Sequence, residues 1–253
     1  MALLHRLLHR PLMPTAGRAL MTAATGLRVA HAQHCIRTAD AVCFDVDSTV
    51  IDSEGIDELA AYLGVGEKVA ALTAAAMGGS QPFHEALAQR LEVMKPTMQQ
   101  LNTMLADHPS VLTPGVDTVI SQLQASGKDV YFVSGGFRQM IGPVADMCNV
   151  SRDNIYANNL LFDESGSFTG YDPEEFTSRA GGKARCVAWL REQHKYSTVV
   201  MVGDGATDME ARELEGGADA FIGFGGVQVR EKVLAGADWF IYDFEEMLAA
   251  MKA

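Results

Sequence analysis

Two aspartates, Asp45 and Asp47, end the apolar run that opens "AVCFDVDSTVID" at residues 41–52. Neighbouring carboxylates repel each other and lose hydration on burial, so a strand that ends in such a pair needs a compensating cation. In a strand, residues i and i+2 point to the same side, so both side chains would face one site while Val46 packs elsewhere. One carboxylate can attack phosphorus and form an aspartyl-phosphate, and a second can act as acid and base. The pair therefore suits phosphoryl transfer.

Further groups suited to the same chemistry follow along the chain. "VSGGFR" offers a hydroxyl and unobstructed glycine amides at Ser134–Gly136, Lys183 begins a helical pattern, and "GDGATD" holds Asp204 and Asp208. Hydroxyls, backbone amides and a lysine bind phosphate, and crowded hard oxygen ligands suit magnesium. Each group alone is commonly a turn, a helix cap or a surface residue. Their occurrence together, each at a strand end or helix start, predicts a magnesium-dependent phosphate site.

The elements that must position these residues form an α/β pattern. Short apolar runs such as "AVCFDVD", "VYFVSGG", "TVVMVGDG" and "AFIGFG" alternate with amphipathic segments such as "GVDTVISQLQASG". This alternation predicts a Rossmann-like, doubly wound parallel sheet over residues 40–54 and 110–253. Ligands bind such sheets at the carboxyl ends of the strands, where the acidic residues stand. Residues 154–171 interrupt the pattern and predict a hairpin turning at 164–166.

Residues 55–109 contain no convincing strand. They show short amphipathic helical patterns separated by glycines and by Pro96. We predict a small helical cap domain, inserted after the first strand.

Composition excludes several classes of function. The chain has 253 residues, of which 48% are hydrophobic, and a formal charge of −12 at pH 7, which argues against a nucleic-acid partner. No apolar run approaches the ~20 residues that a membrane-spanning helix needs, so no membrane partner is expected. Cys35, Cys43, Cys148 and Cys186 show neither CxxC spacing nor histidines at ligand spacing, so we expect buried thiols.

The N-terminal segment, residues 1–39, contains five arginines and no acidic residue, and "MALLHRLLHR" places its leucines at helical spacing. Such an arginine-rich, acid-free, amphipathic leader is typical of an organelle transit peptide. The lack of serine favours the mitochondrion, while a chloroplast stays open. The alternative is a tail without a targeting role on a cytoplasmic protein.

The motifs in this order resemble those of the haloacid dehalogenase-like phosphatases: "FDVDSTV", then "SGGF", then Lys183, then "GDGATDM". The segments "EGIDELA", "AMGGSQPFHEALAQRL", "LTPGV" and "FIGFGG" further resemble the phosphoserine-hydrolysing branch of that superfamily. The likeness runs from about Asp40 to the C-terminus. It implies hydrolysis of O-phospho-L-serine to L-serine and phosphate through an aspartyl-phosphate, as in serine biosynthesis.

The resemblance implies a role for each matching residue of the catalytic motifs. Asp45 would be the nucleophile and Asp47 the acid and base. Asp45, Asp204 and the backbone carbonyl of Asp47 would hold Mg²⁺, with Asp208 behind them as an orienting group. The phosphoryl oxygens would be bound by Ser134, Gly135 and Lys183, with Gly136 and Thr207 nearby.

The resemblance also implies substrate contacts in the cap. Glu54 would receive the substrate ammonium and Arg90 its carboxylate, with Met77 and Gly78 forming an apolar wall. Arg230 would contribute to the same region. Each of these residues also has a purely structural alternative. Glu54 would be an acidic residue that stabilises a helix N-terminus, Arg90 would pair with Glu85 or Glu92 on a solvated face, and Met77 would be a residue of the apolar core.

Two other functions stay open from the sequence. One is a related phosphatase or phosphomutase acting on another small phosphate ester. The other is a phospho-accepting receiver module, although such modules are shorter and lack a cap. The oligomeric state is also open, with a homodimer as one possibility.

Overall fold

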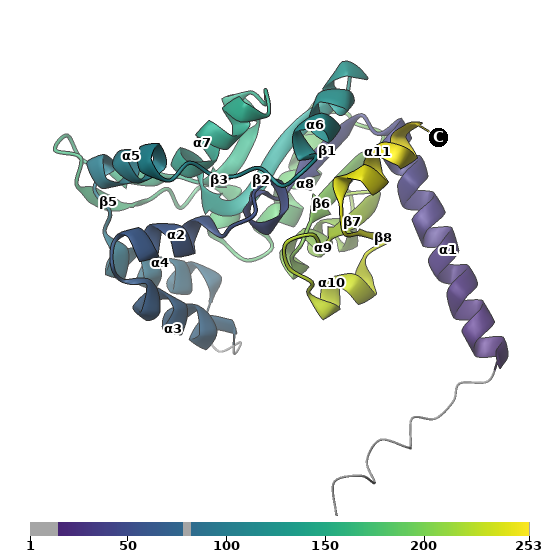
Figure 1. The fold of residues 1–253 in the computed structure, drawn as a ribbon, viewed down its shortest axis with the longest axis horizontal. Coiled ribbons are helices and arrows are strands. Elements are labelled where there is room, and N and C mark those ends of the chain that lie inside the picture. The colour runs from purple at the N-terminus through teal and green to yellow at the C-terminus, as the bar shows by residue number, and fades with distance from the viewer. Residues whose placement is uncertain (1–14, 78–81, 253) are drawn as a thin grey trace, which may run out of the picture.

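A computed structural model describes residues 15–77 and 82–252; the side chains of residues 15–24 and of Met77 lie outside that description. The core is a sheet of six strands in the spatial order β3-β2-β1-β6-β7-β8 (Figure 1). Every neighbouring pair is parallel. This confirms the predicted α/β fold. The strands are β1 (Ala41–Phe44), β2 (Asp129–Phe137), β3 (Ile155–Asn158), β6 (Val199–Gly203), β7 (Ala220–Phe224) and β8 (Trp239–Ile241).

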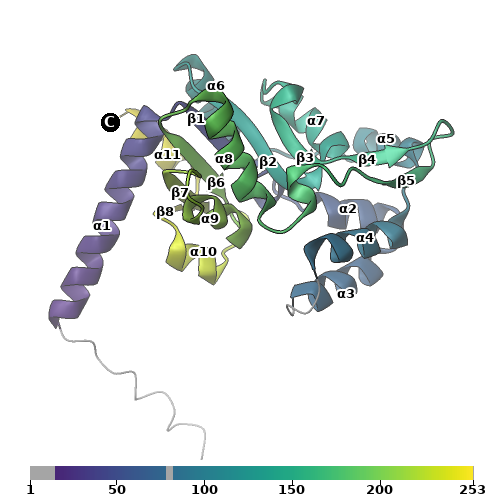
Figure 2. The same ribbon diagram turned by 180° about the vertical axis from the view of Figure 1, so that it is seen from behind.

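Helices cover both faces of the sheet because successive strand residues point to opposite sides. Val42 and Phe44 belong to one apolar core and Cys43 to the other. The first core is covered by α1 (Thr15–Thr38), α6 (Val116–Ala125), α7 (Arg138–Met147) and α11 (Phe244–Lys252). The second is covered by α8 (Gly182–His194), α9 (Ala206–Glu213) and α10 (Glu231–Gly236), of which α8 crosses the sheet in Figure 2.

Four helices follow the first strand, in the segment where the sequence predicts a cap. They are α2 (Gly55–Tyr62), α3 (Gly66–Met77), α4 (Phe83–Met94) and α5 (Met98–Asp107). They share an apolar cluster with the hairpin of β4 (Leu160–Phe162) and β5 (Phe168–Tyr171), which lies on the same side of the molecule (Figure 1). The chain enters and leaves this helical unit through adjacent backbone: Asp52 N–H donates to Val111 O, and Thr113 N–H donates to Val50 O. The division into core and cap at residues 55 and 109 stays our proposal.

The structure corrects the interpretation of residues 154–171. Only β4 and β5 form the antiparallel hairpin, whose turn includes Gly166 as predicted. Residues 155–158 instead form β3, the edge strand of the main sheet, parallel to β2. Ile155 and Ala157 pack in one core while Tyr156 packs against the other. Alternating side chains suit both a hairpin arm and an edge strand, so the pattern alone could not separate the two.

Helix α1 also departs from expectation, because the sequence assigned residues 1–39 to a leader. Ala32, Cys35, Ile36 and Ala39 are between 0% and 3% exposed and belong to the main core. Lys128 Nζ donates hydrogen bonds to the carbonyls of Arg37 and Ala39, both at 2.8 Å. Residues 32–39 are therefore part of the folded domain. Residues 1–14 lie outside the described chain. Among the described residues, no helix is long and apolar enough to cross a membrane.

Candidate active site

Asp45 directly follows β1, at the end of the sheet formed by the carboxyl ends of the parallel strands, where ligands bind such sheets; this end is called the sheet edge below. The backbone then turns at once through η1 (Val46–Val50), where Ser48 adopts a positive φ of 53°. This turn fixes the Asp45 carboxylate: Oδ1 accepts from Val46 N–H at 2.7 Å, and Oδ2 lies 2.8 Å from Lys183 Nζ. The side chain is buried, and Lys183 is the cation that pairs with it.

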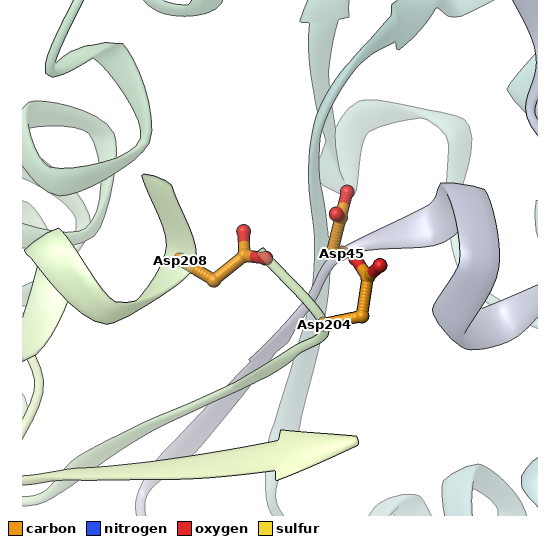
Figure 3. Close-up of side chains that lie close together, drawn as sticks. All are labelled: Asp45, Asp204 and Asp208. Carbon is orange, nitrogen blue, oxygen red and sulfur yellow. The ribbon is translucent and has the colours of Figure 1, made fainter. Parts of the chain in front are cut away.

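Three carboxylates converge at this edge. Oxygens of Asp45, Asp204 and Asp208 lie within 4.8 Å of one another, and Figure 3 shows the three side chains turned toward a common region. Two cations face them: Lys183 Nζ lies 2.6 Å from Asp208 Oδ1, and Arg230 Nε lies 2.8 Å from Asp204 Oδ2. The arrangement fits a divalent cation, because hard carboxylate oxygens from strand ends could coordinate it together.

Asp208 differs from the other two in how its oxygens are used. One oxygen accepts from Lys183 Nζ and the other from Gly205 N–H at 2.9 Å. A Cβ on Gly203 would lie 2.4 Å from Asp208 Cγ, so only glycine permits this approach. Asp208 therefore suits a role that orients Lys183 more than direct coordination of a cation.

The crowding shifts the ionisation of these groups. Burial, and then the charge of Asp45, raise the pKa of Asp47 to about 7 and of Asp204 to about 6, and the same two causes raise the pKa of Asp208. Burial lowers the pKa of Lys183, but the attraction of Asp208 and Asp45 outweighs it, and the net pKa is raised. Lys183 therefore stays protonated over the pH range in which the neighbouring carboxylates are ionised.

Asp47 is held by the first residue of the helical cap. Its Oδ1 accepts from Gly55 N–H at 2.9 Å. Its Oδ2 lies against the backbone of Gly136, where a Cβ would be only 2.8 Å away. The carboxyl group is thus held between η1, the start of α2 and the end of β2, and it lines the same cavity as Asp45.

The glycine-rich end of β2 lies beside the carboxylates. Gly135 and Gly136 line the cavity, as do Lys183 and Thr207. Ser134 is fully buried, and its Oγ accepts from Gly136 N–H at 3.0 Å. A hydroxyl that already accepts one hydrogen bond still has its own proton to donate.

The cavity has a volume of about 390 Å³ and lies between the sheet edge and the helical cap. Glu54, Arg90 and Arg230 all line it, as the sequence analysis expected of substrate contacts. Gly78 and the side chain of Met77 lie outside the described residues.

Glu54, Arg90 and Arg230 differ in the partners that they contact. Glu54 Oε1 accepts from Ser48 Oγ at 2.8 Å and lies 3.2 Å from Arg230 Nη2. Arg90 donates from Nε to Ala86 O at 3.1 Å, and burial lowers its pKa. The described residues contain no carboxylate within ion-pair distance of Arg90, whereas Glu92 pairs with Lys95. The alternative in which Arg90 pairs with Glu85 or Glu92 is therefore wrong.

Several residues that line the cavity were not among the site residues predicted from the sequence. Phe83 and Leu87 precede Arg90 by seven and three residues, so helix periodicity could have placed all three on one face of α4. Thr177 and Arg179 come from the irregular segment before α8, for which no periodic signal exists. The pair Gly181-Gly182 was a usable signal, since it directly precedes Lys183 and also lines the cavity.

Comparison with known proteins defines the class. Residues 39–214 match the family described as haloacid dehalogenase-like hydrolase, so the chain belongs to that family of hydrolases. The match begins two residues before β1 and includes Asp45, Asp47, Asp204 and Asp208.

Individual relatives narrow the assignment. The chain is 54% identical to the chloroplastic phosphoserine phosphatase of Arabidopsis thaliana over 215 residues, which cover 85% of this chain and 72% of that protein. It is 47% identical to the phosphoserine phosphatase of Bos taurus, covering 85% and 94%. A solved phospho-aspartyl intermediate analogue of phosphoserine phosphatase superposes with a TM-score of 0.69 at 26% identity, covering 83% and 97%. The chain is a member of the phosphoserine phosphatase family.

Proposed function

We propose that this chain hydrolyses O-phospho-L-serine to L-serine and phosphate, with Asp45 as the residue that becomes phosphorylated. The observation that carries the proposal is the position of Asp45: it lies on the cavity wall, its Oδ2 is 2.8 Å from Lys183 Nζ, and the loop Ser134–Gly136 lies beside it. Attack by Oδ of Asp45 on phosphorus breaks the ester bond and leaves an aspartyl-phosphate, which water then hydrolyses.

Asp47 is proposed as the acid and base. Its neutral form donates a proton to the departing serine oxygen, and its ionised form then takes a proton from the attacking water. A pKa raised to about 7 by burial suits both steps near neutral pH. The Gly55 N–H at 2.9 Å orients the carboxyl group, so the first turn of the cap helps to place the proton.

Binding of the phosphoryl group is proposed for Lys183, the Ser134 hydroxyl and the glycine-rich loop, with Thr207 across the cavity. Lys183 contributes positive charge at the point where the pentavalent transition state concentrates negative charge. Glycine at positions 135 and 136 leaves the backbone open to close approach by phosphate oxygens.

The donor set fits a magnesium ion. Asp45, Asp204 and the backbone carbonyl of Asp47 would hold it, and Asp208 would orient Lys183. When bound, the ion supplies positive charge that neutralises the carboxylates and the phosphoryl oxygens. The approach of carboxylate oxygens of Asp45 and Asp204 within 4.8 Å of each other supports this proposal.

The amino-acid end of the substrate is proposed to lie against the cap. Arg90 lines the cavity and has no carboxylate within ion-pair distance among the described residues, although the charge of Asp57 acts on it, and such a guanidinium suits the substrate carboxylate. Glu54 suits the ammonium group, and Arg230 links Glu54 to Asp204 across the cavity. A cation and an anion on the cavity wall would disfavour esters that lack the amino-acid end, because the charges of Arg90 and Glu54 would stay unpaired under such a substrate.

The experiment that tests the function is phosphate release by the purified chain from O-phospho-L-serine, with and without Mg²⁺, against a panel of small phosphate esters. We expect magnesium-dependent release that is fastest with phosphoserine. Equal rates across the panel would favour a phosphatase of another small ester. A phosphoenzyme that persists for minutes without turnover would favour the receiver module.

Import into an organelle is proposed on two grounds: the acid-free, arginine-rich start of the chain and its similarity to a relative named as chloroplastic. The burial of Ala32, Cys35 and Ile36 requires that any removed leader end upstream of them. Fusion of residues 1–31 to a fluorescent protein tests the proposal: organelle fluorescence supports import, and a diffuse cytosolic signal contradicts it.

A further inference from the structure

The pairing of β2 with β3 is interrupted beside the glycine-rich loop. Val133 pairs with Tyr156, and the next pair is Phe137 with Asn158. Between these two pairs β2 advances by four residues while β3 advances by two. The extra residues belong to Ser134–Gly136. Such a bulge takes backbone groups out of the ladder, and these groups need other partners when they are buried.

Asn158 supplies the missing partner. Its side chain is fully buried, and Nδ2 donates to the carbonyl of Gly135 at 2.7 Å. A trans peptide is planar, so fixing the Gly135 carbonyl toward β3 turns the N–H of the same peptide, that of Gly136, to the opposite side. That N–H donates to Ser134 Oγ. The Ser134 hydroxyl proton is then left to point elsewhere.

The other atom of the same amide reaches a second segment. Asn158 Oδ1 accepts from Thr177 Oγ1 at 3.3 Å, and Thr177, itself 3% exposed, lines the cavity. Thr177 belongs to η3 (Phe176–Ser178), whose Phe176 carbonyl lies against Gly182, where a Cβ would be 2.0 Å away. The segment thus packs directly on the first residue of α8, next to Lys183.

We propose that Asn158 is a positioning residue for phosphate: a single buried amide that holds the Ser134–Gly136 loop and the segment before Lys183 in fixed relation. It touches neither substrate nor reacting atoms. The inference rests on the proposed function, because it assigns phosphate binding to the same two segments. Its physical basis is that the two ends of one amide make two different bonds: Nδ2 donates to the Gly135 carbonyl and Oδ1 accepts from Thr177 Oγ1.

Asn158→Asp is the sharpest perturbation, because it keeps the shape and replaces the donor by an oxygen. Two acceptor oxygens would then face each other at the Gly135 carbonyl, and the peptide would have to rotate away. Asn154→Asp is the control, because it changes a side-chain amide that also donates to a β2 carbonyl but is only half-buried. Asn154 directly precedes β3, and its Nδ2 donates to Val130 O of β2 at 2.9 Å, at the end of the strand pair away from the cavity.

The readouts separate positioning from general stability. Binding of inorganic phosphate is measured without turnover, as the rise in melting temperature that phosphate produces in magnesium buffer. kcat and KM are measured with phosphoserine and with p-nitrophenyl phosphate. We expect Asn158→Asp to lose about 10²-fold in kcat/KM for both esters, comparable to losing an oxyanion donor, and to lose the phosphate-induced rise. Asn154→Asp should keep both.

A second pair covers the case in which Asn158→Asp does not fold. Thr177→Val removes the hydroxyl that donates to Asn158, and Thr177→Ser keeps it. We expect phosphate binding and turnover to fall in the valine variant and to return in the serine variant. The proposal is overturned if Asn158→Asp binds phosphate and turns over like Asn154→Asp, or if both threonine variants behave alike. A wild-type chain that binds phosphate but hydrolyses no ester would instead refute the proposed function alone.

Discussion

Replacement of Ile36 by alanine tests whether the end of α1 is domain or leader. Ile36 is fully buried in the main core, and Ala32 and Cys35 from the same helix face are buried with it. Removing three buried carbons from a packed site costs about 2–5 kcal/mol, and a central value of about 3 kcal/mol fits a site surrounded by fixed strands. For a domain of this size each kcal/mol lowers the melting temperature by about 2–4 °C. We therefore expect a fall of about 6–12 °C.

Thermal unfolding followed by circular dichroism provides the measurement, with phosphate release at 25 °C as a check that the active site survives. The matched control is Leu27→Ala on the same helix, because Leu27 is 73% exposed. Exposed substitutions of this kind change stability by less than about 0.5 kcal/mol. If Ile36→Ala melts within 1 °C of Leu27→Ala, α1 contributes nothing to the fold, and a leader that extends to residue 39 is restored.

Three further predictions concern the site. Asp45→Asn should abolish turnover and should abolish the acid-stable labelling of the protein by phosphate from phosphoserine. Its melting temperature should stay close to that of the wild type. If the Asp45→Asn variant still becomes labelled, another residue is the nucleophile. Arg90→Ala should reduce kcat/KM for phosphoserine by about 10²-fold, since it removes charge-assisted hydrogen bonds, with little change for p-nitrophenyl phosphate; equal losses on both would argue against a carboxylate contact. Protein freed of metal by EDTA should lose stability between pH 5 and pH 8. The pKa values of Asp47 and Asp204 are raised to about 7 and about 6, so the folded state binds more protons than the unfolded one and is destabilised as pH rises. Restoring Mg²⁺ should remove this dependence of stability on pH. A melting temperature that does not change with pH in EDTA would contradict the raised pKa values of the crowded carboxylates.

The sequence alone determined the catalytic edge of the molecule. The sequence placed Asp45 and Asp47 at one site, and both line one cavity, although Asp47 lies in η1 beyond the strand and not at the next inward position of β1. The rule that parallel sheets bind ligands at the carboxyl ends of their strands brought Asp204 and Lys183 to the same end of the sheet. These are local patterns combined with one general rule of topology. The helical unit after β1 was equally readable, because helix periodicity and glycine punctuation are local signals.

Tertiary structure alone decided the remaining features. The sequence could not show that Ile36 packs on the sheet, that residues 155–158 join its edge, or that Asn158 connects Gly135 with Thr177. In sequence, a helix whose apolar face is buried cannot be told from an amphipathic import leader. Likewise, nothing in the sequence shows whether an asparagine in a strand faces solvent or bonds to the backbone of a bulge. Each of these outcomes depends on which distant segment lies opposite, and periodicity within one segment carries no information about that.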